Sequence, residues 1–377
     1  MKKVLFFVFF LMLPVYGAEI FKGFSIGGDA VFYFQSANPD KNVFPPAQKG
    51  WGNVLNLEAN YSFKGLKFYA RFHNGNGTGI DRVFGDYFFA NANTLGDDNT
   101  DGDYDLKLLE GYFSFSLFND KLEIVAGKTE PLFFIGQNEF ANDEASMFIG
   151  KPLVNDVFVD SENLYAPILG FTYSFRNVEF SGFVQSIERH KVFYNGVSWE
   201  IDETGTHSFG EKLFTGFQVN FKTNFKGLKG NYRFYFYNNS HPHFPFGFNL
   251  NDPNLKPEIE NADGYGLSFD QYVSENLGVF VKYGKAKKKV YAFDEYFALG
   301  FVKTGVFSEK DKILFGYSVI SPVKSSGFGK EYHYETQYGY EFSQNYLLSA
   351  DFQLLKNSYL NSEIDLFVFT LRLTMFF

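Results

Sequence analysis

The sequence contains no cysteine among its 377 residues. Disulfides stabilise many small secreted domains, and cysteine thiolates are common ligands of structural zinc. The absence of cysteine excludes both, together with any cofactor held by a cysteine side chain. The fold must therefore be held by backbone hydrogen bonds and side-chain packing.

Long hydrophobic runs are also absent. Beyond the N-terminal segment there is no stretch of about eighteen apolar residues, so the sequence predicts no transmembrane helix. The mean hydropathy is −0.18, yet Phe, Tyr and Trp make up 21% of the chain, with 52 Phe and 25 Tyr. A membrane β-barrel explains both values, because only alternate strand residues face lipid and the other face stays wet.

Basic residues are outnumbered by acidic ones, 34 against 43, which gives a formal charge of −9. This balance disfavours nucleic acid as a partner. It does not decide the selectivity of a pore, because only charges facing the lumen act on solutes. Arginine is especially scarce, and the six arginines are Arg71, Arg82, Arg176, Arg189, Arg233 and Arg372.

The N-terminal segment has the organisation of a secretory signal peptide. Two lysines precede the apolar run Val4 to Leu13, which is too short to span a bilayer, and small residues follow. We predict that residues 1–18 form a removed signal peptide, cut after Gly17 or Ala18, and that residues 19–377 form one barrel domain. A soluble N-terminal helix is the alternative.

Alternation of apolar and polar residues dominates the remaining chain. Every second residue is apolar between Leu55 and Phe63, and again between Leu66 and Phe72. The phase is kept across Lys64-Gly65, as a tight β-hairpin requires. The same alternation in the last strand ends at Phe377.

Seven short turns alternate with eight longer polar connections, which predicts about sixteen strands with both termini at the short-turn end. We therefore predict an all-β fold, a transmembrane antiparallel β-barrel in the bacterial outer membrane. A soluble β-sandwich is the alternative, although its strands seldom use Phe and Tyr at this density. The turns are expected at 64–65, 119–120, 176–177, 226–227, 274–276, 304–310 and 343–345, and the connections at 37–50, 74–103, 129–165, 188–211, 238–262, 286–292, 321–330 and 357–362.

The face opposite the apolar residues is predicted to line a polar lumen. A lysine or arginine facing lipid at mid-depth costs roughly 2–4 kcal/mol, so inward placement of charges is favoured. Barrels of about 16 to 18 strands are wide enough for an aqueous channel. Each charge taken alone could instead only hydrate the wall or pair with a neighbour. Strand parity places in the lumen Arg71, Glu110, Tyr112, Arg233, Lys282, Glu335 and Arg372.

The third long connection, Thr129 to Tyr165, is too apolar for an exposed loop. It contains the runs Pro131 to Ile135, Met147 to Ile149 and Val157 to Val159. We predict that this third extracellular loop folds inward and narrows the barrel; a cap over the outer mouth is the alternative. The polar residues expected at the constriction are Lys128, Gln137, Asn138, Glu139, Asn142 and Asp143.

Several of these segments resemble the carbohydrate-selective porin (OprB) family. The stretch Asn138 to Glu144, followed by Met147-Phe148, is similar to the family's segment between strand five and the constriction loop. Gly230 to Arg233 resembles its mid-barrel strand, and Leu267 to Gly284 its most recognisable hairpin.

The resemblance covers most of the chain. It implies a monomeric, sixteen-stranded porin that passes sugars through an arginine-bearing constriction. Two features depart from the family pattern: arginine is scarce, and Lys282 stands where the family usually has arginine. Lysine lacks the planar donor fork of arginine, so we expect the selectivity to differ.

The leading hypothesis is an outer-membrane porin for passive diffusion of small hydrophilic solutes, with a preference for carbohydrates. The alternative is a general or ion-selective diffusion porin. An outer-membrane hydrolase built on His73 or His333 is a third hypothesis, but no catalytic constellation is evident. We expect no enzyme activity, cofactor or metal. The expected partners are membrane lipid, lipopolysaccharide, small sugars and, through Phe377, the barrel-assembly machinery.

Weaker motifs have simpler interpretations. Asp97 to Asp103 has the opening spacing of a calcium loop, but Leu108 stands where the bidentate glutamate belongs, so a solvated acidic loop is favoured. His241 and His243 lack an evident third metal ligand. Gly75 to Gly79 lacks the following helix of a phosphate-binding loop. Lys285 to Lys289 could meet lipopolysaccharide phosphates or be solvated.

Overall fold

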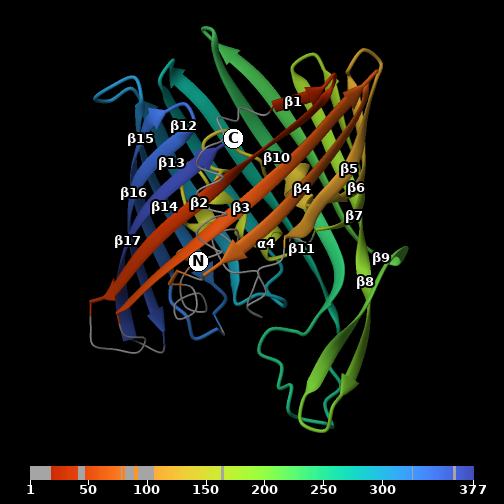
Figure 1. The fold of residues 1–377 in the computed structure, drawn as a ribbon. Coiled ribbons are helices and arrows are strands. Elements are labelled where there is room, and N and C mark those ends of the chain that lie inside the picture. The colour runs from red at the N-terminus through yellow and green to blue at the C-terminus, as the bar shows by residue number, and fades with distance from the viewer. Residues whose placement is uncertain are drawn as a thin grey trace, which may run out of the picture.

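The computed structural model describes residues 18–40, 47–77, 79–80, 89–91, 106–162, 165–324, 326–359 and 362–377. These residues are almost entirely β-strand (Figure 1). The strands are β1 (Ala18–Phe21), β2 (Phe24–Pro39), β3 (Gln48–Phe63), β4 (Leu66–Asn76), β5 (Lys107–Leu117), β6 (Leu122–Thr129), β7 (Ala166–Phe175), β8 (Val178–Tyr194), β9 (Trp199–Phe225), β10 (Leu228–His243), β11 (Glu260–Ser274), β12 (Leu277–Ala286), β13 (Phe293–Thr304), β14 (Asp311–Pro322), β15 (Glu331–Ser343), β16 (Tyr346–Tyr359) and β17 (Ser362–Phe376).

Strands β2 to β17 form a closed antiparallel barrel of sixteen strands, as predicted. Each strand pairs with the next in the chain, and β17 pairs back onto β2, with Leu371 opposite Phe34. The short β1 pairs with β2 on the same side as β17, opposite Ser25 and Ile26. Directly beside it, the main chain of Phe377 exchanges hydrogen bonds of 2.8 and 3.0 Å with Gly28.

Short turns join the strands at the end that carries β1 and the end of β17, at the seven predicted places. The turn between β3 and β4 shows the local cause. Lys64 and Gly65 both have positive φ, 46° and 82°, and a two-residue turn of this kind matches the twist of the paired strands.

The structure corrects the prediction of a polar connection at residues 188–211. Strands β8 and β9 continue through it and pair up to Tyr194 opposite Trp199. The resulting hairpin extends past the other strands (Figure 1). Trp199 donates its indole N–H to the carbonyl of Asp252 over 3.0 Å, which ties the hairpin to the loop after β10. Outside a membrane both strand faces meet water, so the apolar alternation that marks the other strands is not needed there.

Burial across the wall is inverted relative to a soluble protein. On β15, Glu335 and Gln337 are buried, whereas Tyr334 and Tyr338, which flank them, are more than a third exposed. Soluble proteins seldom bury glutamate and glutamine while they expose large aromatic side chains in rows. A lipid-facing outer surface and a polar interior explain the pattern. Within the described residues, no helix is long and apolar enough to cross a membrane.

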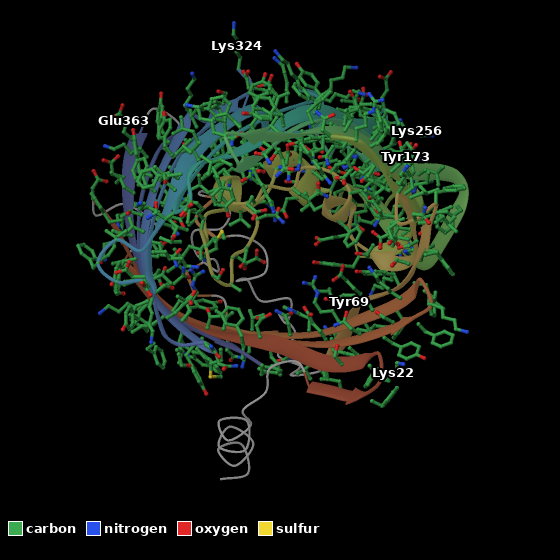
Figure 2. All side chains as sticks on the ribbon, turned by 90° about the horizontal axis from the view of Figure 1, so that it is seen from above. Lys22, Tyr69, Tyr173, Lys256, Lys324 and Glu363 are labelled. Atoms are coloured by element: carbon green, nitrogen blue, oxygen red, sulfur yellow. The ribbon has the colours of Figure 1, made fainter. Side chains whose placement is uncertain are left out.

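The segment between β6 and β7 lies inside the ring of strands (Figure 2). It contains a 3-10 helix, η2 (Pro131–Phe133), and two short helices, α3 (Lys151–Val154) and α4 (Val157–Ser161). We call residues 130–162 the inner segment. It forms an apolar cluster with inward-facing wall residues; the cluster includes Phe148, Leu153, Val157, Phe158, Phe280, Tyr296 and Leu314.

Candidate solute pathway

A cavity of about 530 Å³ remains between the inner segment and the wall formed by β2, β3 and β4. Polar side chains from both sides surround it. The wall contributes Asp29, Asn56, Arg71 and His73, and the opposite side contributes Leu132, Phe133, Gln137, Asn142, Asp143, Glu144, Ala145, Asn155 and Asp160, with Leu109, Glu130 and Tyr165 at its edges.

Arg71 is held on the wall side by residues of two neighbouring elements. It lies opposite Glu110 in the β4–β5 register, and its Nε is 2.9 Å from Glu110 Oε2. The Thr129 hydroxyl donates to Glu110, and the Arg71 guanidinium donates to the Tyr165 hydroxyl over 3.0 Å. Arg71 is therefore fixed in a geometry that presents one edge of its guanidinium to the cavity.

The acidic residues of the inner segment form a turn that is stabilised by its own main chain. Asp143 accepts hydrogen bonds from the N–H groups of Ala145 and Ser146, over 2.8 and 3.2 Å. Burial, and then the adjacent Asp143, raise the pKa of Glu144 to about 8. The cavity side of the segment thus carries two neighbouring carboxyl groups, one of which changes charge near neutral pH.

Aromatic rings continue from the wall to the cavity. The rings of Tyr69 and Tyr112 on β4 and β5 are 5.1 Å apart, and Tyr112 meets Phe133 edge-on at 5.5 Å. Phe133 is 39% exposed although it lies within the barrel. The sequence predicted Tyr112 in the lumen; here it supports a ring that faces the cavity.

Arg372 and Glu335, both expected along the solute path, instead bind the main chain of the inner segment. Arg372 donates to the carbonyls of Met147, over 2.7 Å, and Glu144. Glu335 accepts from the N–H groups of Ile149 and Gly150, over 2.7 and 2.9 Å. Both side chains are about 1% exposed. The inner segment covers them because they satisfy main-chain groups that lie away from water.

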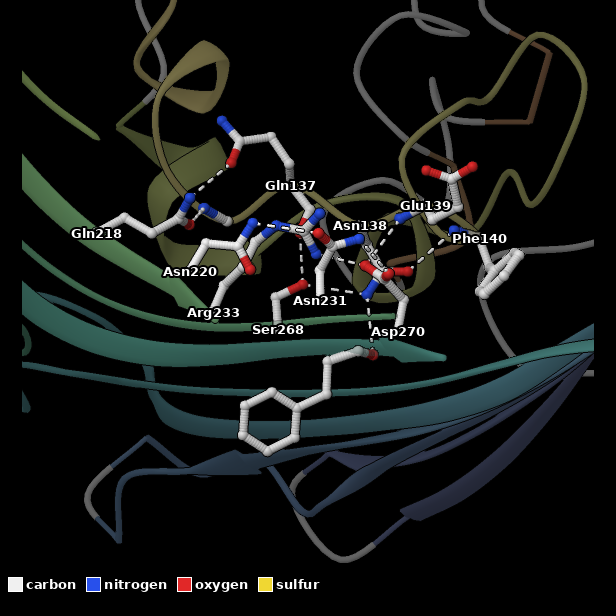
Figure 3. Close-up of polar contacts among 12 residues, drawn as sticks. Gln137, Asn138, Glu139, Phe140, Gln218, Asn220, Asn231, Arg233, Ser268 and Asp270 are labelled. Atoms are coloured by element: carbon white, nitrogen blue, oxygen red, sulfur yellow. Dashed lines mark hydrogen bonds and ion pairs between the residues drawn. The ribbon is translucent and has the colours of Figure 1, made fainter. Parts of the chain in front are cut away.

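Arg233 and Lys282 have similar positions. Arg233 forms an ion pair with Asp270, which also accepts from the N–H of Glu139 over 3.2 Å (Figure 3). Lys282 donates to the carbonyl of Asn155 over 2.8 Å and is fully buried. These two bases therefore position the inner segment and do not line the cavity, which differs from the sequence-based expectation.

Three further predicted residues fall in different places. Asn138 donates to the Ser268 hydroxyl and the Phe269 carbonyl, over 3.1 and 3.2 Å, and anchors the segment to β11 (Figure 3). Asn142 lines the cavity and is exposed there. Lys128 is next to the inward-facing Thr129 and so points to the other face of β6, where it donates to the Leu108 carbonyl over 2.9 Å.

From the sequence, several of the cavity-lining residues are not assigned to the solute path, and His73 is considered only as a hydrolase residue. Asn56 and His73 could have been found by strand parity, and their side chains lie 2.9 Å apart. Asp29 required a reading of β2, where glycines and small residues obscure the alternation. Asp160 could be found only from the three-dimensional path of the inner segment, because its partner Lys151, 3.0 Å away, lies on the preceding helix.

The weaker motifs have structural partners where they are described. His243 lies 3.1 Å from Glu162 at the end of α4. Lys287 and Lys289 both pair with Glu260, at 3.0 and 2.9 Å. Residues Asp97 to Asp103 lie outside the described part of the chain, as does Thr78 of the glycine-rich stretch. In the described part, no group of three or more His, Asp or Glu side chains is arranged to hold a metal ion.

The fold is shared with solved porins. A high-pH structure of Pseudomonas putida OprB matches with a TM-score of 0.73 and 14% identity, over 94% of both chains. A low-pH structure of the same protein matches with 0.56 and 13%, over 94% of this chain and 93% of that chain. The outer membrane channel DcaP of Acinetobacter baumannii matches with 0.56 and 10%, over 96% and 100%.

At these identities the structural matches establish the fold alone. A search among curated proteins gave no match. The family model described as "Carbohydrate-selective porin, OprB family" matches residues 48–377, which is most of the barrel. The family is a class of channels and not of enzymes, and its barrels imply an outer-membrane location. The chain belongs to the carbohydrate-selective porin (OprB) family.

Proposed function

We propose that the protein is a passive outer-membrane channel for small hydrophilic solutes, with a preference for carbohydrates, and that solutes pass through the cavity between β2–β4 and the inner segment. The cavity carries the proposal, because it is lined by amides, carboxylates and one guanidinium beside an exposed aromatic ring. Such a set offers hydrogen bonds to hydroxyl groups and an apolar face to a sugar ring. The inner segment would be the third extracellular loop, folded inward to narrow the barrel.

Planar-bilayer recordings with the purified protein test this proposal. Discrete current steps are expected in KCl, and added glucose or maltose should reduce the current in a saturable way. A protein that gives no current would overturn the channel function. A current that sugars leave unchanged would overturn the carbohydrate preference and favour the second candidate.

The second candidate is a general or ion-selective diffusion porin with the same fold. One observation favours it: of the three arginines with described inward-facing side chains, only Arg71 lines the cavity, while Arg233 and Arg372 are buried against other groups. Liposome-swelling rates distinguish the candidates. A carbohydrate-preferring channel should pass sugars faster than other neutral polyols of equal size, whereas a general porin should rank solutes by size alone.

Processing and assembly are further parts of the proposal. We infer that residues 1–18 are removed on export, and that Phe377 is recognised by the barrel-assembly machinery. We also propose a monomer that contacts lipid and lipopolysaccharide through its outer surface. Mass spectrometry of the protein from outer membranes tests the cleavage, with a new N-terminus expected after Gly17 or Ala18. Light scattering in detergent tests the monomer.

A further inference from the structure

The first turn of the inner segment, residues 131–137, presents two different groups to the cavity. Phe133 and Gln137 both line it. The Gln137 amide donates to the carbonyl of Leu132 over 2.9 Å, which uses one of its two amide hydrogens. The same turn therefore offers a solute an apolar ring and a polar amide.

The side chain of Phe134 attaches this turn to the barrel wall. Phe134 is 1% exposed, and its ring lies over Gly170 on β7, where a Cβ atom would be only 2.3 Å from Phe134 Cε1. The rings of Phe133 and Phe134 are 5.0 Å apart and meet edge-on. Because Phe134 is inserted against the wall, the neighbouring ring of Phe133 is presented to the cavity.

Gln218 on β9 holds the end of the turn. Its Oε1 accepts the N–H of Gly136 over 2.9 Å, and its Nε2 donates to Gln137 Oε1 over 3.0 Å (Figure 3). The side chain of Gln218 is 2% exposed. A carboxamide carries an acceptor and donors on separate atoms without a charge, so one side chain can make both bonds.

The main chain of the turn fits this arrangement. Gly136 has a φ of 77°, a conformation that glycine adopts without the cost of a side chain. Ser181 on β8 lies opposite Gln218 in the β8–β9 register, and its hydroxyl donates to the Phe134 carbonyl over 2.6 Å. Two neighbouring wall strands thus bind the turn on both sides of Ile135.

We propose that Phe133 and Gln137 form one subsite for a pyranose ring, and that Gln218 is the positioning residue that holds the two groups in place. The ring of Phe133 would lie against the apolar face of the sugar, and the Gln137 amide would bind a hydroxyl group. This inference rests on the carbohydrate preference proposed above and deepens it, because it names the subsite and the residue behind it.

Current-block titrations with maltose, on the purified protein in planar bilayers, test the role of Gln218. Gln218→Met keeps the length of the side chain but removes both hydrogen bonds. Apparent maltose affinity should fall about threefold to tenfold, and the KCl conductance should stay close to the native value. If Gln218→Met does not fold, Gln218→Asn carries the same expectation, because its amide is one methylene too short to make both bonds.

Gln353→Met is the matched control. Gln353 is also a glutamine on the inner face of the wall, 3% exposed, but it belongs to β16. The same substitution there should leave the maltose affinity unchanged.

A double variant tests whether Gln218 acts through the subsite. If it does, the losses of maltose affinity in Phe133→Ala and Gln218→Met should be less than additive when the two are combined. A general loosening of the barrel by Gln218→Met would instead add fully to the effect of Phe133→Ala and would change the KCl conductance as well.

The outcomes separate this inference from the proposed function. A native protein without current, or with a current that maltose leaves unchanged, overturns the proposed function and this inference with it. If maltose blocks the native protein, three results overturn only the present inference. These are native affinity in the Gln218 variants, an equal loss in Gln353→Met, and full additivity in the double variant.

Discussion

Arg71 and Glu110 face each other across adjacent strands, with the guanidinium Nε 2.9 Å from the carboxylate. The pair places a compensated positive charge at the edge of the cavity. Thr129 and Tyr165 complete the hydrogen bonding around it. Each partner therefore controls the electrostatic effect of the other.

Replacing one partner should change ion selectivity in opposite directions. Glu110→Gln leaves the arginine charge uncompensated, so the K⁺ over Cl⁻ permeability ratio should fall about twofold or more. Arg71→Gln should raise it. Reversal potentials measure both effects. A change of the same sign in the two variants would contradict the opposite effects of the two charges and would indicate a rearranged pore.

Arg372→Gln should loosen the inner segment. The variant loses the donors to the Met147 and Glu144 carbonyls and removes the guanidinium near Glu335. Removing one member of a buried charged group typically costs about 3–5 kcal/mol. We expect larger and noisier single-channel currents and unfolding at lower denaturant concentration. Arg176→Gln, in the turn between β7 and β8, is the control, and equal effects in both would argue against the anchoring role.

The selectivity should depend on pH through Glu144. Its pKa is raised from 4.5 to about 8, so the carboxyl is protonated below that pH and charged above it. The K⁺ over Cl⁻ permeability ratio should therefore rise between about pH 7 and pH 9, and Glu144→Gln should abolish much of this rise. A raised pKa means that the folded state favours the neutral acid, so this group's contribution to stability is present below pH 4.5 and is lost as the pH rises through 8. A pH dependence identical in the variant would contradict the assignment.

Phe133→Ala should weaken the interaction with sugars more than it changes the conductance of small ions. The ring is exposed inside the barrel and is supported edge-on by Tyr112. An aromatic face contributes about 0.5–1.5 kcal/mol beyond its buried area in ring contacts, so apparent sugar affinity should fall severalfold. Current-block titrations measure it. Phe113→Ala, an exposed outer-face aromatic on β5, should leave the block unchanged.

Phe352→Lys should destabilise the barrel because the new lysine faces lipid, whereas Gln353→Lys should not carry this cost. Phe352 is 54% exposed on the outer face of β16, and Gln353 is buried on the inner face. A lysine facing lipid at mid-depth costs roughly 2–4 kcal/mol. Unfolding in lipid vesicles should show this loss for Phe352→Lys. Full stability of that variant in vesicles would contradict the inside-out orientation of the wall.

The strands and their turns could be predicted from the sequence because their signal is local. Alternation over a few residues fixes which face is wet, and Lys64-Gly65 fixes a register by itself. The hairpin of β8 and β9 was missed because the apolar alternation within residues 188–211 is short and limited to Val197, Trp199 and Ile201. The two strands pair up to Tyr194 opposite Trp199 because the hydrogen-bonded ladder that begins in the barrel wall continues into the hairpin.

The cavity could be predicted only in part, because its shape depends on distant contacts. Parity placed Arg71, Glu110 and Arg372 on the inner face correctly. It could not show that the partner of Arg372 is the carbonyl of Met147, 225 residues earlier in the chain. Once the inner segment binds such a side chain, an inward-facing charge becomes an anchor and no longer meets the solute.

The pairing of β17 with β2 has a consequence for biosynthesis. The ring is completed only when the final strand, down to Phe377 beside Gly28, lies against the first barrel strand. A nascent or truncated chain that lacks β17 keeps two strand edges whose N–H and C=O groups have no partner, and such edges recruit other chains. An unfinished chain therefore remains prone to aggregation and open to proteolysis until β17 is made and pairs with β2.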